Sequence, residues 1–459
     1  MRLRGAPATS LAALFASSVA RAQAEPPEVT VRGDPAGGFV SRADERTSPR
    51  ELTDAASLIE PLPGVHVRRF GADDSFSTLS IRGSSSTEVA VLLAGVPLTG
   101  GADPSLDLST LPLWPGAVMR VHRSFAPAAL GPGSLGGTLV LEPPRPGSPE
   151  AADLWVAGGS YGQARLRAGD VRDLGGGSRV ATALSASRAD DDFSYLDPRT
   201  STPGHDVYTT RANAGHAAVD GLVSWALPVH WSSRSAGAVT VTTLLQDRRQ
   251  QLPGTVLGPT PFARLSSDRE LASAELTGGL GPGAWVARGW GKREGLGLHD
   301  AAASAAVGPT LADQTIVGTG GAIGWRGRPS ERVSLDARVD GSGERFAPGE
   351  VEGAPSPPGA NRGSAGAGVD AEWRAAEALS LAASGRVDAW SGGASDGTRT
   401  ADVRPTGHLG VELPLEAVTL AAHTGVTARP PSFVELYGDR GAFLGDATLR
   451  PESASTVDA

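Results

Sequence analysis

The sequence predicts two parts, a mixed α+β unit in roughly the first third of the chain and an antiparallel β-barrel of the membrane-spanning type in the rest. At 459 residues the chain is too long for one ordinary compact core. Its 61 glycines and 35 prolines are spread along the whole chain, which favours many strands and turns over a helical enzyme. From residue 151 onward, alternating segments of about ten residues recur between Gly, Asp, Pro and Ser, as in transmembrane barrels.

Composition and spacing exclude several functional classes. The absence of cysteine removes disulfide frameworks, thiolate zinc sites and cysteine nucleophiles. The 41 basic and 50 acidic residues give a net charge of −9, opposite to the basic surface that phosphate backbones require, so we expect no nucleic-acid partner. The eight histidines show no short ligand spacing, and no nucleophile elbow or P-loop occurs. We therefore expect no metal site, no cofactor and no enzymatic activity.

Residues 1–24 are predicted to be a secretory signal peptide. Two arginines precede an apolar run, and a small-residue cleavage pattern ends at Ala24. The run is shorter than the roughly 20 residues that cross a bilayer, so a retained membrane anchor is the weaker interpretation. No apolar span of that length follows, which excludes a helical membrane protein and leaves a closed barrel as the structure that satisfies backbone groups in lipid.

The segment after the predicted cleavage site is suited to strand addition. Consecutive β-branched residues in Glu28-Val29-Thr30-Val31-Arg32 favour an extended backbone. An extended free segment can add itself to the sheet edge of a partner protein through main-chain hydrogen bonds. The alternative is an untethered linker.

Residues 48–142 are predicted to form the mixed α+β unit. Ser48-Pro49-Arg50-Glu51 has the pattern of a capping box with proline at the first helical position, and it predicts a short helix that Glu60-Pro61 ends. A loop over 71–75 separates the first two strands that follow. The predicted strands are Val65–Val67, Leu79–Ile81, Val89–Ala94, Val118–Ser124 and Thr138–Leu141.

One group of glycines has the spacing of a dinucleotide-binding motif. Gly131, Gly133 and Gly136 satisfy the dinucleotide-binding spacing, which needs a helix that starts at the last glycine. Here a β-like run follows and prolines end it at Pro143-Pro144. We therefore reject nucleotide binding.

Four motifs in this unit resemble the plug domain of TonB-dependent outer-membrane receptors. They are Leu62-Pro63-Gly64-Val65, Leu79-Ser80-Ile81-Arg82-Gly83, the run from Val89 to Pro97, and the run from Gly131 to Gly137. A second pattern, Arg429-Pro430-Pro431-Ser432-Phe433-Val434-Glu435-Leu436-Tyr437 with the later Leu449-Arg450-Pro451-Glu452, resembles the barrel of the same family. The chain departs from the family at His122, where a glutamate is usual, which puts any contact of that glutamate in doubt.

The resemblance implies a mixed α+β plug inside a transmembrane antiparallel barrel of about 22 strands. About thirteen strand candidates are present and the chain does not end on an aromatic residue, so we expect the barrel to be incomplete. The expected domains are a signal peptide at 1–24, a periplasmic segment with the TonB box at 25–47, the plug at 48–142, a linker at 143–150 and part of the barrel at 151–459.

The resemblance also assigns roles to residues. Glu28, Val29, Thr30, Val31 and Arg32 correspond to the TonB box. Arg82 corresponds to an arginine that locks the plug to carboxylates of the barrel wall, and a solvated surface arginine is the alternative. In the plug loop, Asp73, Asp74 and Phe76 are expected to face the substrate.

Tryptophans near the predicted strand ends suit a girdle at the headgroup level. Ordinary core packing is the alternative for each of them. The expected girdle members are Trp155, Trp225, Trp285, Trp325 and Trp390.

The implied function is active uptake of a scarce ligand across the outer membrane. The expected partners are TonB with its inner-membrane energising complex, outer-membrane lipid, and a metal chelate such as siderophore-iron or a cobalamin-like ligand, taken up by a monomer. The sequence does not choose among ligands, although the plug layout is closer to cobalamin-type and catecholate-type receptors. The alternative is a secreted or surface β-rich binding or adhesion protein without transport, and a secreted hydrolase ranks third because no catalytic constellation is found.

Overall fold

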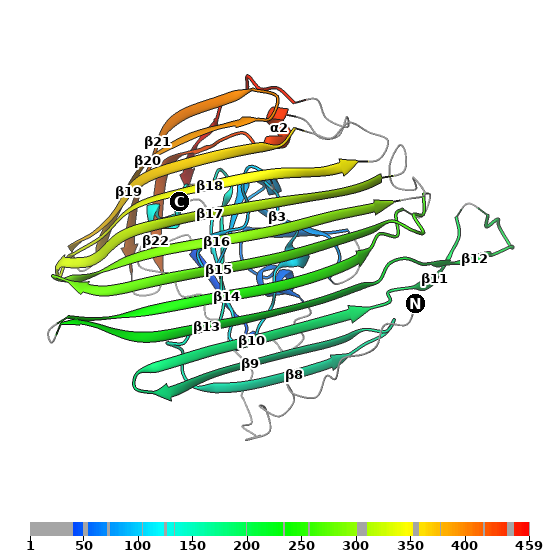
Figure 1. Cartoon of the computed structure of the whole chain (residues 1–459), viewed down its shortest axis with the longest axis horizontal. Helices are drawn as coiled ribbons and strands as arrows, with labels where there is room; N and C mark the ends of the chain where they lie inside the picture. The colour runs from blue at the N-terminus through cyan, green and yellow to red at the C-terminus, as the bar shows by residue number, and fades with distance from the viewer. Residues whose placement is uncertain are drawn as a thin grey trace.

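The structure, a computed structural model, consists of a long strand wall that curves around a smaller inner unit (Figure 1). Within the residues described, no helix has both the length and the apolar character needed to cross a membrane. The predicted signal peptide and the segment from Glu28 to Arg32 lie outside the described residues. The description covers residues 40–458 except 49–53, 71–73, 103, 124–125, 133, 199, 233–234, 256–257, 301–309, 352–357, 377, 416–417 and 438–444.

The inner unit, here called the plug, is a five-stranded sheet with a separate hairpin and a short helix. The sheet has the order β1-β6-β7-β4-β5, in which β4 and β7 are parallel and the other pairs are antiparallel, and β2 pairs with β3. The elements are β1 (Val40–Asp44), α1 (Ala55–Ile59), β2 (Val65–Arg69), β3 (Ser77–Ile81), β4 (Val89–Leu93), β5 (Val96–Pro97), β6 (Val118–His122) and β7 (Gly137–Glu142), with 3-10 turns η2 (Ser86–Glu88), η3 (Leu108–Thr110) and η4 (Ala128–Leu130).

The plug has its own apolar core. Strands β4 and β7 are apolar on both faces because each is covered on both sides, and Leu93, Leu139 and Leu141 are fully buried. Trp114, also fully buried, joins the same cluster. The positions predicted for β2, β3, β4, β6 and β7 are thus confirmed, and β7 follows Gly136 directly as a strand, as the rejection of nucleotide binding required.

Two sequence predictions about the start of the plug were wrong. The N-cap of α1 is Asp54, whose carboxylate accepts from the Ser57 N–H at 2.8 Å, while the Ser48 hydroxyl donates to the Asp44 carbonyl. The helix therefore starts later than the proposed cap at Ser48. The plug sheet, in contrast, starts earlier, because β1 pairs with β6 inside the range 25–47 that was assigned to the periplasmic segment. A pairing across so many residues leaves no local pattern in the sequence.

The wall is a 14-stranded antiparallel sheet, close to the predicted count of about thirteen. Among the residues described, its end strands β8 and β23 each pair with one other wall strand. In sheet order the strands are β8 (Ala151–Gly158), β9 (Ala164–Gly175), β10 (Ser178–Ala189), β13 (His216–Ser232), β14 (Ser235–Gln251), β15 (Arg264–Leu280), β16 (Gly283–Asp300), β17 (Thr310–Ser330), β18 (Val333–Val351), β19 (Ala360–Ala376), β20 (Leu379–Ala394), β21 (Arg399–Pro414), β22 (Thr419–Arg429) and β23 (Glu452–Asp458).

Side chains alternate between the two faces of this wall, as β13 and β20 show. In β13, Val219 and Val223 are 47% and 49% exposed on the outer face, whereas Asp220 and Leu222 are 5% and 2% exposed toward the plug. The same alternation places Val387 outside and the charged Arg386 and Asp388 inside in β20. An apolar outer face and a polar inner face are the arrangement of a barrel wall in lipid.

Of the five tryptophans predicted to form a girdle on the outer face of the wall, three lie on that face and two lie on the inner face. Trp225, Trp285 and Trp325 lie on the outer face, and the Trp325 indole donates to the Leu280 carbonyl at 3.0 Å. Trp155 alternates with outward neighbours, and a guanidinium lies 4.3 Å from its ring centre on the inner face. Trp390 is 7% exposed and faces the plug. Successive side chains of a strand point to opposite faces, so counting residues from an outward-facing neighbour distinguishes the two groups.

The two ends of the wall differ in their connections. At one end the strands are joined by short turns, as at 176–177, 281–282 and 331–332. At the other end several connections are much longer. Residues 190–215 contain the hairpin of β11 (Phe193–Leu196) and β12 (Tyr208–Arg211), and residues 430–451 contain α2 (Phe433–Tyr437). The β11–β12 hairpin projects beyond the wall at the right of Figure 1.

Candidate functional site

The candidate site is the interface between plug and wall, where wall side chains contact the plug backbone. Most of the contacts are polar, although Ala183, Leu222, Leu244 and Leu271 of the wall pack against the plug core. Wall donors reach plug carbonyls in the pairs Gln246 and Arg269 to Thr110, Arg248 to Ser109, Lys292 to Leu98, and Arg386 to Ala128. Wall carboxylates accept from plug donors in the pairs Glu344 with Gly101 and Ala102, Asp370 with Ala128, and Asp220 with the Trp114 indole.

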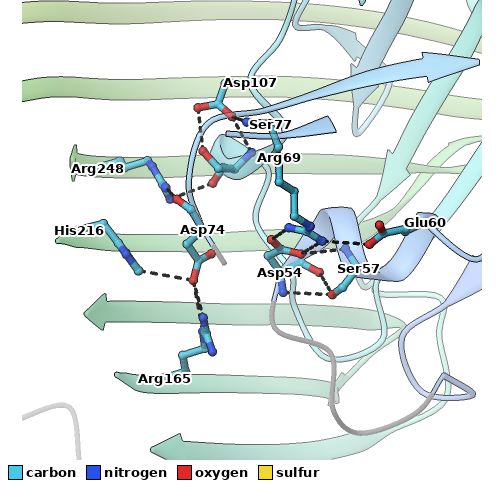
Figure 2. A network of polar contacts seen from close by, with 11 residues as sticks. Asp54, Ser57, Glu60, Arg69, Asp74, Ser77, Asp107, Arg165, His216 and Arg248 are labelled. Carbon is cyan, nitrogen blue, oxygen red and sulfur yellow. Dashed lines mark hydrogen bonds and ion pairs between the residues drawn. The ribbon is translucent and has the colours of Figure 1, made fainter. Parts of the chain in front are cut away.

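Asp74, in the plug loop between β2 and β3, is at the centre of one set of contacts (Figure 2). Arg165 Nη2 donates to Asp74 Oδ2 at 2.9 Å, and His216 Nε2 lies 3.4 Å from the same oxygen. Arg248 donates to the Asp74 backbone carbonyl. Burial raises the pKa of the Asp74 carboxyl, but His216, Arg165 and Arg248 outweigh it and lower the pKa to about 2. The carboxylate is therefore ionised at all physiological pH values and fixes the loop to three wall strands.

Two further carboxylates hold this region from the plug side, as Figure 2 shows. Asp54 binds both terminal nitrogens of Arg69, which joins α1 to β2 and raises the pKa of the Arg69 guanidinium. Asp107 accepts from the Ser77 N–H at 2.9 Å, although burial raises the pKa of its carboxyl. These contacts stay within the plug, so the loop at Asp74 is rigid on one side and bound to the wall on the other.

The predicted substrate-facing residues have different surroundings. Asp73 lies outside the described residues, whereas Asp74 is 7% exposed and its oxygens are in contact with wall cations. Phe76 is 38% exposed, and its ring lies 5.3 Å from that of Phe70. Phe76 also lines a cavity of about 180 Å³ between plug and wall, together with Arg248. Of the predicted residues that are described, only Phe76 presents an open surface.

Arg82 lies in the turn after β3, not within the strand. Its φ of 52° and that of Gly83, 81°, make this turn left-handed, and the Arg82 N–H donates to the Gly64 carbonyl at 2.7 Å. This bond joins the Ile-Arg-Gly and Leu-Pro-Gly turns. The Arg82 guanidinium forms an ion pair with Asp458 of β23, and His423 Nε2 lies 3.3 Å from the other Asp458 oxygen. The structure thus places Arg82 against an inward-facing wall carboxylate.

A larger cavity, about 200 Å³, lies between plug strand β4 and wall strands β16 to β20. Trp290 and Trp390 supply aromatic surface, and Lys292, Glu344 and Arg362 supply charges. Within the part of the chain that the structure describes, no group of three or more acidic or histidine side chains is arranged to hold a metal ion. The lining of the cavity is thus a mixture of polar and aromatic side chains.

Sequence reasoning missed the wall side of this interface. Arg165, Arg248, Glu344 and Arg386 all lie on the inner face, each at the parity opposite to outward valines or leucines. These wall residues could have been identified as inward-facing, because charged residues at every second position of a barrel strand face the lumen. Their plug partners are mostly backbone groups, which no side-chain pattern in the plug sequence reveals.

Comparisons with known proteins agree with this geometry. A family model described as the TonB-dependent Receptor Plug Domain matches residues 39–138. Among solved structures, the chain is similar to the copper transporter OprC (TM-score 0.71, 17% identity, covering 94% of this chain and 70% of that chain). It is also similar to the FrpB iron transporter from Neisseria meningitidis (0.68, 12%, 92% and 70%) and to the ferric yersiniabactin uptake receptor FyuA from Yersinia pestis (0.61, 14%, 86% and 65%).

These findings confirm the resemblance and the predicted fold class. The identities are low, so the solved structures establish the arrangement of plug and wall but not a ligand. The family model thus identifies residues 39–138 as a TonB-dependent receptor plug domain, and the solved structures show that the chain as a whole shares the fold of such receptors.

Proposed function

We propose that the chain takes up a scarce ligand across the outer membrane and that TonB supplies the pull that moves the plug. The observation that supports this most is the construction of the interface: a plug with its own apolar core is attached to the wall largely through hydrogen bonds and ion pairs. Exchanging such a contact for water costs about 0.5–1.5 kcal/mol for a neutral hydrogen bond and about 1.5–3 kcal/mol where one partner is charged. The plug can therefore shift without its core being dismantled.

Short periplasmic turns and longer outer loops are typical of outer-membrane barrels, so the end with the connections 190–215 and 430–451 is assigned to the cell exterior. The Asp74 network lies near this end, because Arg165 and His216 are at the strand ends beside the long connections. Ligand then arrives over Phe76, with Asp73 and Asp74 in the same loop. Asp74 acts there by fixing the loop's position.

The remaining roles follow the same assignment. The TonB box is placed at Glu28 to Arg32, where TonB adds a strand from the periplasmic side. Arg82 is the plug-barrel lock, and Asp458 is its wall carboxylate. The preferred ligand class is a metal or metal chelate, because the similar structures are named as copper, iron and ferric yersiniabactin transporters. Cobalamin stays the second class.

The experiment is uptake in intact cells. Radiolabelled ferric siderophores and cyanocobalamin, offered one at a time, are expected to accumulate in cells with TonB and not in cells without it. Val31→Pro is expected to abolish accumulation at unchanged receptor abundance, because proline removes a main-chain donor from the added strand. Gly37→Pro, outside the predicted box, is the matched control. Equal accumulation with and without TonB would contradict the proposal.

A further inference from the structure

The segment from Arg429 to Tyr437 packs against the plug. The Phe433 N–H donates to the Gly101 carbonyl at 2.6 Å, and the Phe433 side chain is 4% exposed. This segment leaves the end of β22 at the side of the long connections. It therefore joins the outer end of the wall to the plug loop of residues 98–102.

The residue types in this segment are explained by that contact. Arg429 binds Glu435 and Glu452, which fixes α2 relative to the ends of β22 and β23. The Pro431 carbonyl accepts from Arg362, and the Arg362 guanidinium carbon lies 5.0 Å from the Phe433 ring centre. The outcome is one phenylalanine ring held rigidly toward the plug.

On the plug side, two glycines receive this ring and a wall carboxylate. Neither Gly100 nor Gly101 has a positive φ, so the backbone does not require glycine there. The limited space requires it instead. A Cβ on Gly101 would lie 3.0 Å from the Phe433 ring, and a Cβ on Gly100 would lie 2.7 Å from Glu344 Oε1. Glu344 also accepts from the Gly101 N–H at 2.8 Å and the Ala102 N–H at 3.3 Å.

We propose that Phe433 and Glu344 form a clamp that holds the plug loop of residues 98–102 in the closed position, and that Gly101 must leave Phe433 before the plug opens the larger cavity. Gly100, Gly101, Glu344 and Arg362 all line that cavity, so the clamp forms part of its boundary. Phe433 is a positioning residue in this scheme. The inference rests on the proposed function only for the source of the opening force, since the contact itself is independent of TonB.

The test uses accessibility of the cavity. Because the chain has no cysteine, a single Ser364→Cys substitution on the inner face of β19 reports on it. Intact cells that lack TonB are treated with a membrane-impermeant maleimide, and the labelling rate is compared between variants of equal abundance. Phe433→Ala is expected to label roughly tenfold faster than the parent, because loss of a buried aromatic contact favours local opening. Val434→Ala, on the exposed side of the same helix, is the matched control.

A second pair of variants tests the direct contact. Gly101→Ala is also expected to label faster, because its methyl group meets the ring. The double variant Gly101→Ala/Phe433→Ala is expected to label no faster than Phe433→Ala alone, since the methyl group then meets only the end of the flexible Arg362 side chain, which can move aside. Equal rates for Phe433→Ala and Val434→Ala, or rates that multiply in the double variant, would overturn the clamp. The parent is also labelled in cells with TonB. If TonB does not change its labelling rate, the proposed function is contradicted, whereas the clamp is still decided by the comparison of variants in cells without TonB.

Discussion

The core of the plug and the interface of the plug with the wall are built from different interactions. The core is apolar, with Leu93, Leu139 and Leu141 fully buried between the plug strands. The interface combines one apolar strip near Leu244 with many hydrogen bonds from wall side chains to plug backbone groups. The plug core therefore does not depend on most of the contacts that attach the plug to the wall.

The plug core and the interface are stabilised by contributions that are lost in different events. Burial of a leucine side chain contributes about 1.5–3 kcal/mol that is lost only on unfolding. A hydrogen bond or ion pair between plug and wall can contribute a similar amount, but it can be exchanged for contacts with water while the plug stays folded. The plug should therefore leave the wall more easily than it unfolds, and three substitutions test this, from the largest effect to the smallest.

Leu141→Ala is expected to have the largest effect. Leu141 lies in β7, fully buried, and its truncation leaves a cavity that costs about 2–5 kcal/mol. The denaturant dependence of amide exchange in β4 and β7 of the intact chain measures the loss. Leu154→Ala, at a position that is 67% exposed on the outer face of β8, is the control and is expected to leave plug exchange unchanged. Similar losses in both variants would contradict an independent plug core.

Asp74→Asn is expected to have an intermediate effect, confined to the interface. The lowering of the Asp74 pKa from the usual 3.8 to about 2 corresponds to about 2 kcal/mol. Because the pKa is lower in the folded state, this contribution is present above about pH 4 and is lost as the pH falls through about 2.

The protection factors of the amides near Asp74, which correct for the pH dependence of intrinsic exchange, should therefore fall on acidification toward about pH 2 in the parent and lose most of that dependence in Asp74→Asn. Asp192→Asn, at an exposed loop position, is the control. An identical acid response in parent and Asp74→Asn would show that this carboxylate does not hold the loop.

Arg82→Gln is expected to have the smallest effect on stability. The Arg82 and Asp458 side chains are 31% and 23% exposed, and a pair of that exposure contributes up to about 1 kcal/mol. The expected signature is a small rise in exchange at the Ile81–Gly83 turn with β4 and β7 unaffected. A loss as large as that of Leu141→Ala would mean that Arg82 supports the plug core rather than its attachment.

Much of the fold was predictable because its signals are local. Turn glycines at Gly64 and Gly83 have positive φ, and short apolar runs such as Val89–Leu93 mark buried strands. The alternation along the wall predicted both its antiparallel strands and, nearly, their number. These features depend on a few neighbouring residues and survive in a single sequence.

The interface was not predictable because its contacts join residues far apart in the chain and often end on backbone atoms. Nothing near Gly101 identifies Glu344 or Phe433 as its partners, although the two adjacent glycines indicate close approach of some other group. The Arg429–Tyr437 pattern was recognised by resemblance alone, and its contact with the plug became visible only in the structure.

The most direct test of whether the plug leaves the wall more easily than it unfolds is hydrogen exchange of the intact chain at increasing denaturant concentration. Amides that donate across the interface, those of Gly101, Ala102 and Ala128, are expected to exchange through openings of lower free energy than the amides of β4, β6 and β7. One shared exchange rate with the same denaturant dependence for both sets would contradict the account, because the plug would then leave the wall only by unfolding.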